Sequence, residues 1–181
     1  MKMRGDPDTW DWGPPKTRPP TWPDDPDVRR AMEWFRDLIP SAEWKTRRLA
    51  HVKKLHGAPA SPLPDELPQP FVADDDIGGW YLMLAEAFVD HIADYEPAQG
   101  SRVVPLFKVM GRDFDLLMSI EGVEERARRM LSTERGQPDG AMFELITALA
   151  YRRDGWPAVR FLQEHPGVAR VPDFEVVGPQ G

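Results

Sequence analysis

Hydrophobic residues recur at three- and four-residue spacing along most of the chain, which is the pattern of amphipathic helices. This spacing predicts helices over residues 28–39, 41–56, 77–95, 102–120, 123–131 and 141–153, the last opened by Pro138-Asp139-Gly140. We expect Asp27 to be the N-cap of the first helix and Ser41 that of the second. Asp74, Asp75 and Asp76 precede the third helix, where carboxylates interact favourably with the positive end of the helix dipole.

The pattern changes after Gly155, where apolar and polar residues begin to alternate. Residues 156–162 and 170–176 are rich in β-branched and aromatic side chains and are predicted to be strands, joined through a turn at residues 165–167. In the second strand, Asp173 and Glu175 are expected to share one face. The sequence therefore predicts an α+β fold that is mostly α-helical, with five to six helices and a C-terminal two-stranded β-hairpin.

Proline divides the chain into segments. Seven of the 20 prolines lie in residues 1–27 and five in residues 59–70. We expect the first segment to lie across the domain surface with Trp10, Trp12 and Trp22 docked, because indoles are costly to leave in water; docking on another protein is the alternative. The predicted segments are a Pro/Trp-rich arm (1–27), a helical pair (28–57), a Pro-rich linker (58–73), a helical region (74–137), a helix plus hairpin (138–177) and a tail (178–181).

Composition excludes several classes of protein and site. The chain has no cysteine, which excludes disulfides, a cysteine nucleophile and cysteine-ligated zinc. No apolar run approaches the ~18–20 residues needed to span a bilayer, and the N-terminus lacks the apolar stretch of a signal peptide. We expect a soluble cytoplasmic protein that does not contact a membrane. The four histidines lack the spacing of a zinc site, and no phosphate-binding glycine loop or Gly-x-Ser-x-Gly elbow is present.

The net charge of −7 conceals a strong segregation. Residues 28–57 carry eight basic and three acidic side chains, a net +5, whereas residues 58–100 carry nine acidic side chains and no Lys or Arg, a net −9. The two segments could pack together, face a charged partner, or simply be solvated helix faces. The predicted helix 41–56 is basic and amphipathic, and contact with the DNA backbone is one interpretation beside a solubilising face. The cations concerned are Lys45, Arg47, Arg48, Lys53 and Lys54.

Glu144 is the one side chain in the last predicted helix whose environment indicates chemistry. It is the only carboxylate between Ala141 and Arg153, and small residues surround it at helical spacing. A buried carboxylate without a partner would be expensive, so burial would require one. An acid on a strand opposite this helical acid, such as Asp173, would give a geometry that can hold a divalent metal through oxygen ligands.

These elements carry a family resemblance. A helix with Glu144, then a strand ending at Leu162, then a segment Pro172-Asp173-Phe174-Glu175-Val176 resembles the first half of the PD-(D/E)XK, or restriction-endonuclease-like, nuclease superfamily. In that family a helical Glu precedes a strand, a Pro-Asp pair begins the next, and a third strand brings a Glu-x-Lys. The resemblance implies that Asp173 is the metal-ligating catalytic acid, that Glu144 is the supporting metal-site acid, and that Mg²⁺ serves hydrolysis of DNA phosphodiesters.

The chain departs from the family pattern after Asp173. It contains no Lys after Lys108, and it ends at Gly181 without a second acid and Lys on a third strand. General-base help alone is worth ~10²–10⁴-fold in rate. We therefore expect a nuclease-like protein that is catalytically incomplete in this chain: a truncated product, a fragment or a non-catalytic scaffold.

A non-enzymatic protein-interaction or assembly module is the alternative. Either the Trp-rich arm or the edge of the C-terminal strand would bind a protein partner or a second copy of the chain, because exposed strand edges recruit partners.

Overall fold

The computed structural model describes residues 24–57, 75–133, 138–162 and 173–178. Within these ranges the chain forms seven α-helices, one 3₁₀ helix and a two-stranded antiparallel sheet. The mostly α-helical α+β fold with a C-terminal hairpin, expected from the sequence, is confirmed. Nearly all of the predicted arm, the linker and the hairpin turn lie outside the described residues. No helix in the described ranges has the length and apolar character to span a membrane.

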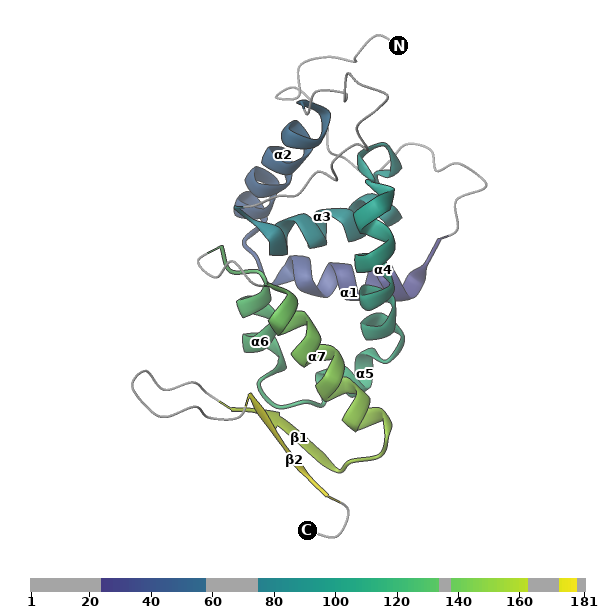
Figure 1. The fold of residues 1–181 in the computed structure, drawn as a ribbon, viewed down its shortest axis with the longest axis vertical. Helices are drawn as coiled ribbons and strands as arrows, with labels where there is room; N and C mark the ends of the chain where they lie inside the picture. The colour runs from purple at the N-terminus through teal and green to yellow at the C-terminus, as the bar shows by residue number, and fades with distance from the viewer. Residues whose placement is uncertain (1–23, 58–74, 134–137, 163–172, 179–181) are drawn as a thin grey trace, which may run out of the picture.

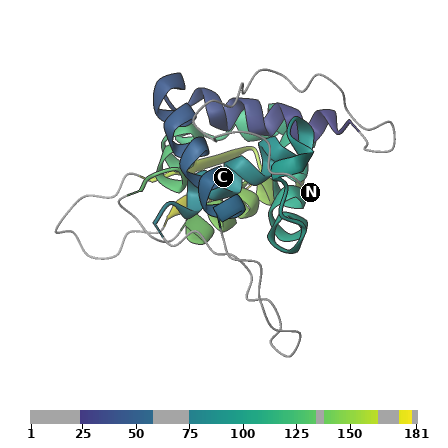
Figure 2. The same cartoon turned by 90° about the horizontal axis from the view of Figure 1, so that it is seen from above.

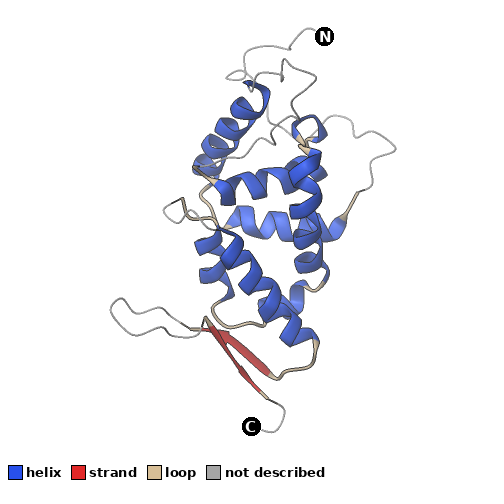
Figure 3. Ribbon diagram, in the orientation of Figure 1, coloured by secondary structure: helices blue, strands red, loops and turns tan. Residues whose placement is uncertain are grey.

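Figures 1 and 3 show how these elements are arranged. Helix α2 lies at one end, α1 and α3 cross the middle, and the hairpin lies at the other end beneath α7 (Figure 1). The view from above, in Figure 2, shows α1 along one side of the helical body. The helices are α1 (Pro26–Asp37), α2 (Ser41–Gly57), α3 (Ile77–Val89), α4 (Pro97–Arg112), α5 (Phe114–Met118), α6 (Val123–Met130) and α7 (Pro138–Arg153), with the 3₁₀ helix η2 (Ile92–Asp94) between α3 and α4.

Helix α1 begins two residues earlier than predicted. Asp25, not Asp27, is the N-cap, and its carboxylate accepts a hydrogen bond from the Val28 amide at 3.3 Å. Pro26 occupies the first turn, where a missing amide hydrogen costs nothing, and this favours the earlier start. Asp27 instead lies in the first turn as an acidic residue near the positive end of the helix.

Two predicted helices are shorter or divided in the structure. The helix predicted over 77–95 ends at Val89, and the following turn η2 carries Asp94 into the interior. The helix predicted over 102–120 begins at Pro97, where the Glu96 carboxylate caps it, and it is separated from α5 at Asp113. The periodicity of apolar residues continues across both breaks, because the residues after each break still pack on the same core.

The core is built mainly by α1, α3 and α4. Helix α1 buries Val28, Ala31, Met32 and Phe35 at helical spacing, and the Phe35 ring lies 5.2 Å from that of Phe107 on α4. Helix α3 is the most enclosed, since most of its residues are buried. Apolar side chains fill most of this region, so much of its stability comes from apolar burial.

The hairpin packs on α7 through aromatic side chains. Strands β1 (Ala158–Phe161) and β2 (Phe174–Val177) pair antiparallel, with Phe161 opposite Phe174. The Phe174 ring contacts that of Tyr151 on α7, with centroids 5.9 Å apart. The outer edge of β1 is covered by Glu121, which exchanges backbone hydrogen bonds with Val159 and Phe161 at 3.3 and 2.9 Å. Strand β2 pairs only with β1 among the described residues.

The close approach of α1 and α4 gives a test of the packing. A Cβ atom on Gly111 would lie 1.7 Å from the carbonyl oxygen of Asp27, so the two backbones must separate to admit one. Gly111→Ala is expected to lower the free energy of unfolding by about 2 kcal/mol, the usual cost of overpacking. In α7, a Cβ on Gly140 would meet nothing within 4 Å. Gly140→Ala is therefore expected to stabilise by about 0.5–1 kcal/mol. Urea unfolding of both variants checks this, and equal stabilities would contradict the packing described.

Candidate functional site around Arg126

Arg126 on α6 lies at the centre of the C-terminal unit. It is 4% exposed, and its Nη1 lies 2.5 Å from Oε2 of Glu144 on α7. Its Nη2 donates a hydrogen bond to the carbonyl oxygen of Asp173 at 3.2 Å. The guanidinium also lies over the Phe161 ring, 5.0 Å from the centroid. One side chain therefore joins α6, α7, the end of β1 and the start of β2.

Backbone geometry fixes the two ends of this arrangement. Gly122 adopts a left-handed conformation, with φ of 78°, at the N-cap of α6, and this lets the chain turn from the β1 edge into the helix. At the other end, the carbonyl of Asp173 also accepts from the Leu162 amide at 3.1 Å. Both donors hold the same oxygen, so the entry of the chain into β2 is set by β1 and Arg126 together.

The structure brings the two sequence-predicted acids to the same guanidinium without joining their carboxylates. Glu144 is partly buried and contacts Arg126 through its side chain, whereas Asp173 contacts it through its backbone. Asp173 is exposed and lies in phase with Glu175, whose carboxylate pairs with Arg160 across the hairpin at 2.9 Å. Phe174, one residue on, faces α7. Glu144 and Asp173 are neighbours in the fold, but the strand phase directs Asp173 away from the face that packs on α7.

The described residues do not fit the Mg²⁺ ion that the family resemblance implies. Mg²⁺ prefers near-octahedral oxygen coordination and is held by carboxylates. No group of three or more His, Asp or Glu side chains converges anywhere in the described ranges. The carboxylate of Glu144 is already neutralised by Arg126. We therefore derive no hydrolytic step for these residues.

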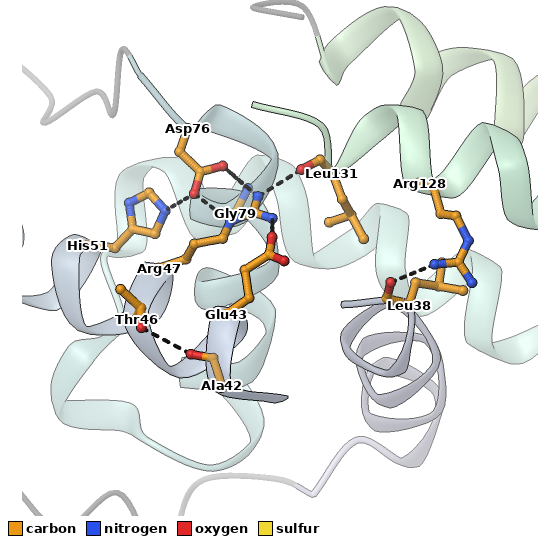
Figure 4. A network of polar contacts seen from close by, with 10 residues as sticks. All are labelled: Leu38, Ala42, Glu43, Thr46, Arg47, His51, Asp76, Gly79, Arg128 and Leu131. Atoms are coloured by element: carbon orange, nitrogen blue, oxygen red, sulfur yellow. Dashed lines mark hydrogen bonds and ion pairs between the residues drawn. The ribbon is translucent and has the colours of Figure 1, made fainter. Parts of the chain in front are cut away.

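The predicted nucleic-acid cations on α2 include two that bind carboxylates inside the fold. Arg47 donates two hydrogen bonds to the Asp76 carboxylate, at 2.7 and 2.9 Å, and a third to the Leu131 carbonyl at 2.8 Å (Figure 4). Arg48 is buried and donates to Glu86 and Asp94 at 2.7 and 3.0 Å.

The other three cations lie at the surface of α2. Lys54 pairs with Asp75, and Lys45 and Lys53 are exposed. The basic α2 thus packs on the acidic segment that follows it, one of the interpretations that the charge segregation left open.

Asp76 is the centre of the α2–α3 contact. It caps α3 through the Gly79 amide at 3.0 Å and accepts from Nε2 of His51 at 3.0 Å (Figure 4). Burial alone would raise the pKa of this carboxyl, but hydrogen bonds from His51 and Arg47 outweigh it and hold the pKa well below its ordinary value. The sequence indicated a favourable helix-dipole position for Asp76, but neither its N-cap hydrogen bond nor its partners His51 and Arg47.

Arg126 was not identified from the sequence, although a signal for it exists. It lies on the same helical stripe as Val123, Ala127 and Met130, all of which are buried. When such a helix packs on the core, an arginine on its apolar face becomes buried, and its guanidinium then needs a carboxylate or a carbonyl oxygen as a partner. Glu144 was predicted to need a partner if buried, and Arg126 is that partner.

Comparison of the chain with protein-family models, with curated proteins and with solved structures finds no match. The function is therefore argued from the arrangement around Arg126 and from the resemblance of the helix–hairpin sequence.

The ion pair between Arg126 and Glu144 is expected to couple α6 to α7 energetically. Arg126→Met leaves a partly buried carboxylate without this cation, and we expect it to lower the free energy of unfolding by about 3 kcal/mol. Glu144→Gln should also destabilise, and the double variant should lose less than the sum of the two, as contacting residues do. Urea unfolding of the wild type, the two single variants and the double variant measures the coupling.

The control is Arg128→Met on the exposed side of α6, which should change the free energy of unfolding much less. Additive effects of the Arg126 and Glu144 substitutions would contradict the pairing.

The lowered pKa of Asp76 predicts a pH-dependent contribution to stability. Its ionised form is favoured in the fold, so the stabilisation is fully present above the unfolded pKa of about 4 and is lost as pH falls toward the folded pKa. Asp76→Asn should lower the free energy of unfolding by about 3 kcal/mol at pH 7, and the deficit should shrink below about pH 4. Asp75→Asn is the control, because Asp75 and Lys54 form an exposed pair worth little. A deficit that is the same at pH 7 and pH 3 would contradict the assignment.

Proposed function

We propose that residues 138–177 are the N-terminal half of a PD-(D/E)XK-like nuclease core and that residues 1–181 alone are catalytically incomplete. In this proposal Glu144 is the helical acid and Asp173 the strand acid of a DNA-cleaving site. No Lys follows Lys108 in residues 1–181, so the Glu-x-Lys of the family core is not found among them. Helices α1 to α6 are an extension that folds against this half core.

The observation that carries the proposal is the meeting of Glu144 and Asp173 around one guanidinium. Glu144 and Asp173 are 29 positions apart in the sequence. Because α7 packs on the hairpin, Arg126 contacts both residues. The two residues share this guanidinium in different ways, Glu144 through its carboxylate and Asp173 through its backbone carbonyl. The order of helix, strand and antiparallel strand is also that of the family.

The free edge of β2 supports the same proposal. Glu121 covers the outer edge of β1, whereas β2 has no second partner among the described residues. In the family order, the next strand follows the strand that Pro-Asp begins, so it would pair along this open edge. A strand there would bring its side chains beside Asp173, at the start of β2.

An assembly module without chemistry is the second candidate, and exposed apolar side chains favour it. The Phe143 side chain on α7 is 72% exposed and Val177 on β2 is 41% exposed. Apolar groups and an open strand edge on one unit are typical of protein-interaction surfaces. In this alternative the β2 edge would pair with a partner protein or with a second copy of the chain.

The reading frame that follows codon 181 gives the sharpest test. If it encodes a strand with Glu-x-Lys, the extended protein is expected to nick supercoiled plasmid in the presence of Mg²⁺. Asp173→Asn should lower that rate about 100-fold or more, because a metal contributes several kcal/mol to the transition state. The control is Glu175→Gln on the same strand, whose carboxylate pairs with Arg160. Residues 1–181 alone should show no Mg²⁺-dependent cleavage.

Two outcomes would contradict this proposal in different ways. Cleavage by residues 1–181 that Asp173→Ala abolishes would mean that the chain is already complete. A frame without the acid and Lys, together with a concentration-dependent dimer in light scattering that Phe143→Ser dissociates, would favour the assembly module instead.

A further inference from the structure

The outer edge of β2 carries backbone hydrogen-bonding groups that β1 does not use. The Leu162 amide donates to the Asp173 carbonyl at 3.1 Å, which sets the phase of the hairpin. Residues that exchange hydrogen bonds alternate with residues that do not along an antiparallel pair, so Glu175 bonds to β1 whereas Phe174 and Val176 direct their amides and carbonyls to the other side. These groups have no hydrogen-bond partner among the described residues. Strand β2 therefore offers an open edge to an incoming strand.

The outer face of the sheet alternates in charge from one segment to the next. Glu121 pairs with Arg160 of β1 in a parallel bridge. Arg160 lies opposite Glu175 of β2, with its Nη2 2.9 Å from Oε1 of the carboxylate. Side chains of directly opposite residues share one face, so the row runs acid, base, acid and ends at the open edge. Asp173, in phase with Glu175, adds a carboxylate that forms no ion pair within the described ranges.

We propose that this edge binds an extended segment of a partner protein with the pattern apolar–basic–apolar, its Lys or Arg opposite Glu175. An antiparallel addition makes hydrogen-bonded pairs with Phe174 and Val176 and sets the basic residue opposite Glu175 in the pair whose side chains lie closest. The apolar residues on either side then lie beside Phe174 and Val176, which pack against the core. A carboxylate accepts from more than one donor, so Glu175 keeps its contact with Arg160. Main-chain hydrogen bonds supply affinity in this mode of recognition, and the side chains supply specificity.

A second copy of the chain fits this edge less well. An antiparallel pair of β2 strands centred on Glu175 sets the two Glu175 carboxylates opposite each other. Centring the pair on Phe174 sets Glu175 opposite Asp173 of the second copy, and like charges directly opposite are destabilising. Centring it on Val176 sets Glu175 opposite Val177, which supplies no cation. The inference rests on the second candidate function, the assembly module, and names the chemistry of its partner at this edge.

Two peptides that differ in one residue test the charge selectivity. The full chain is titrated into a fluorescein-labelled peptide with Thr-Val-Lys-Val-Thr at its centre, and into a second peptide with Glu in place of the Lys, and anisotropy is followed. We expect the Lys peptide to bind about fivefold more tightly than the Glu peptide, the effect of one cross-strand charge pair. Glu175→Lys should reverse the order of the two affinities. Glu33→Lys makes the same change of charge at an exposed position of α1 and should keep the wild-type order.

Amide hydrogen exchange tests the strand addition without any substitution. The amides of Phe174 and Val176 are expected to exchange rapidly in the free chain and to slow when the Lys peptide is added. The Glu175 amide should be protected by β1 in both states. Protection of Phe174 and Val176 in the free monomer would overturn the inference, because another segment would already occupy the edge. Protection that rises with protein concentration alone would assign the edge to a second copy and would also overturn it.

The remaining outcomes separate this inference from both candidate functions. Equal affinities for the two peptides, an unchanged order in Glu175→Lys, or no binding of either peptide would overturn the proposed partner. Peptide binding requires neither Mg²⁺ nor cleavage, so its failure leaves the result of the plasmid assay unchanged. A dimer that Phe143→Ser dissociates would involve α7, and it would support the assembly module even if neither peptide binds at β2.

Discussion

The ion pair between Arg126 and Glu144 is the interaction on which the C-terminal unit depends. Moving a guanidinium out of water is expensive, and the fold recovers this cost only where an acid and hydrogen-bond acceptors surround the group. Glu144, the Asp173 carbonyl and the Phe161 ring meet that need from three different elements. Because each of them must be in place for Arg126 to be buried, α6, α7 and the hairpin fix one another's positions.

The N-terminal half also contains a buried arginine that is paired with carboxylates from other elements. Arg48 is 4% exposed and is held by Glu86 on α3 and Asp94 on η2. His56 also contacts Asp94, at 3.0 Å. Helix α2 buries few apolar side chains, so these charged contacts decide where it sits. Among the described residues, Arg47, Arg48 and Lys54 of the basic segment pair with carboxylates of the acidic segment, so part of the charge segregation along the sequence is an internal pairing.

The sequence predicted the elements better than the contacts between them. Apolar periodicity located helices such as α1 and α4, because a helix that packs on a core buries one face regardless of which element covers that face. It missed the break after Val89, since Tyr95 still packs on the core once the helix has ended. Glu144 was predicted to need a partner if buried, but the partner could not be named, because Arg126 reaches it only after α6 and α7 dock. Asp173 was selected as a candidate because of the Pro-Asp motif. The direction of its side chain relative to α7 could be inferred only from the register of β1 and β2.

The Arg126 side chain also gives a physical reason for α6 to accompany α7 and the hairpin. Without α6, the partly buried Glu144 carboxylate would lose the guanidinium that pairs with it, and burying a carboxylate is costly unless it is paired. Helix α6 supplies that cation and also donates to the Asp173 carbonyl, so α6, α7 and the hairpin stabilise one another as a unit.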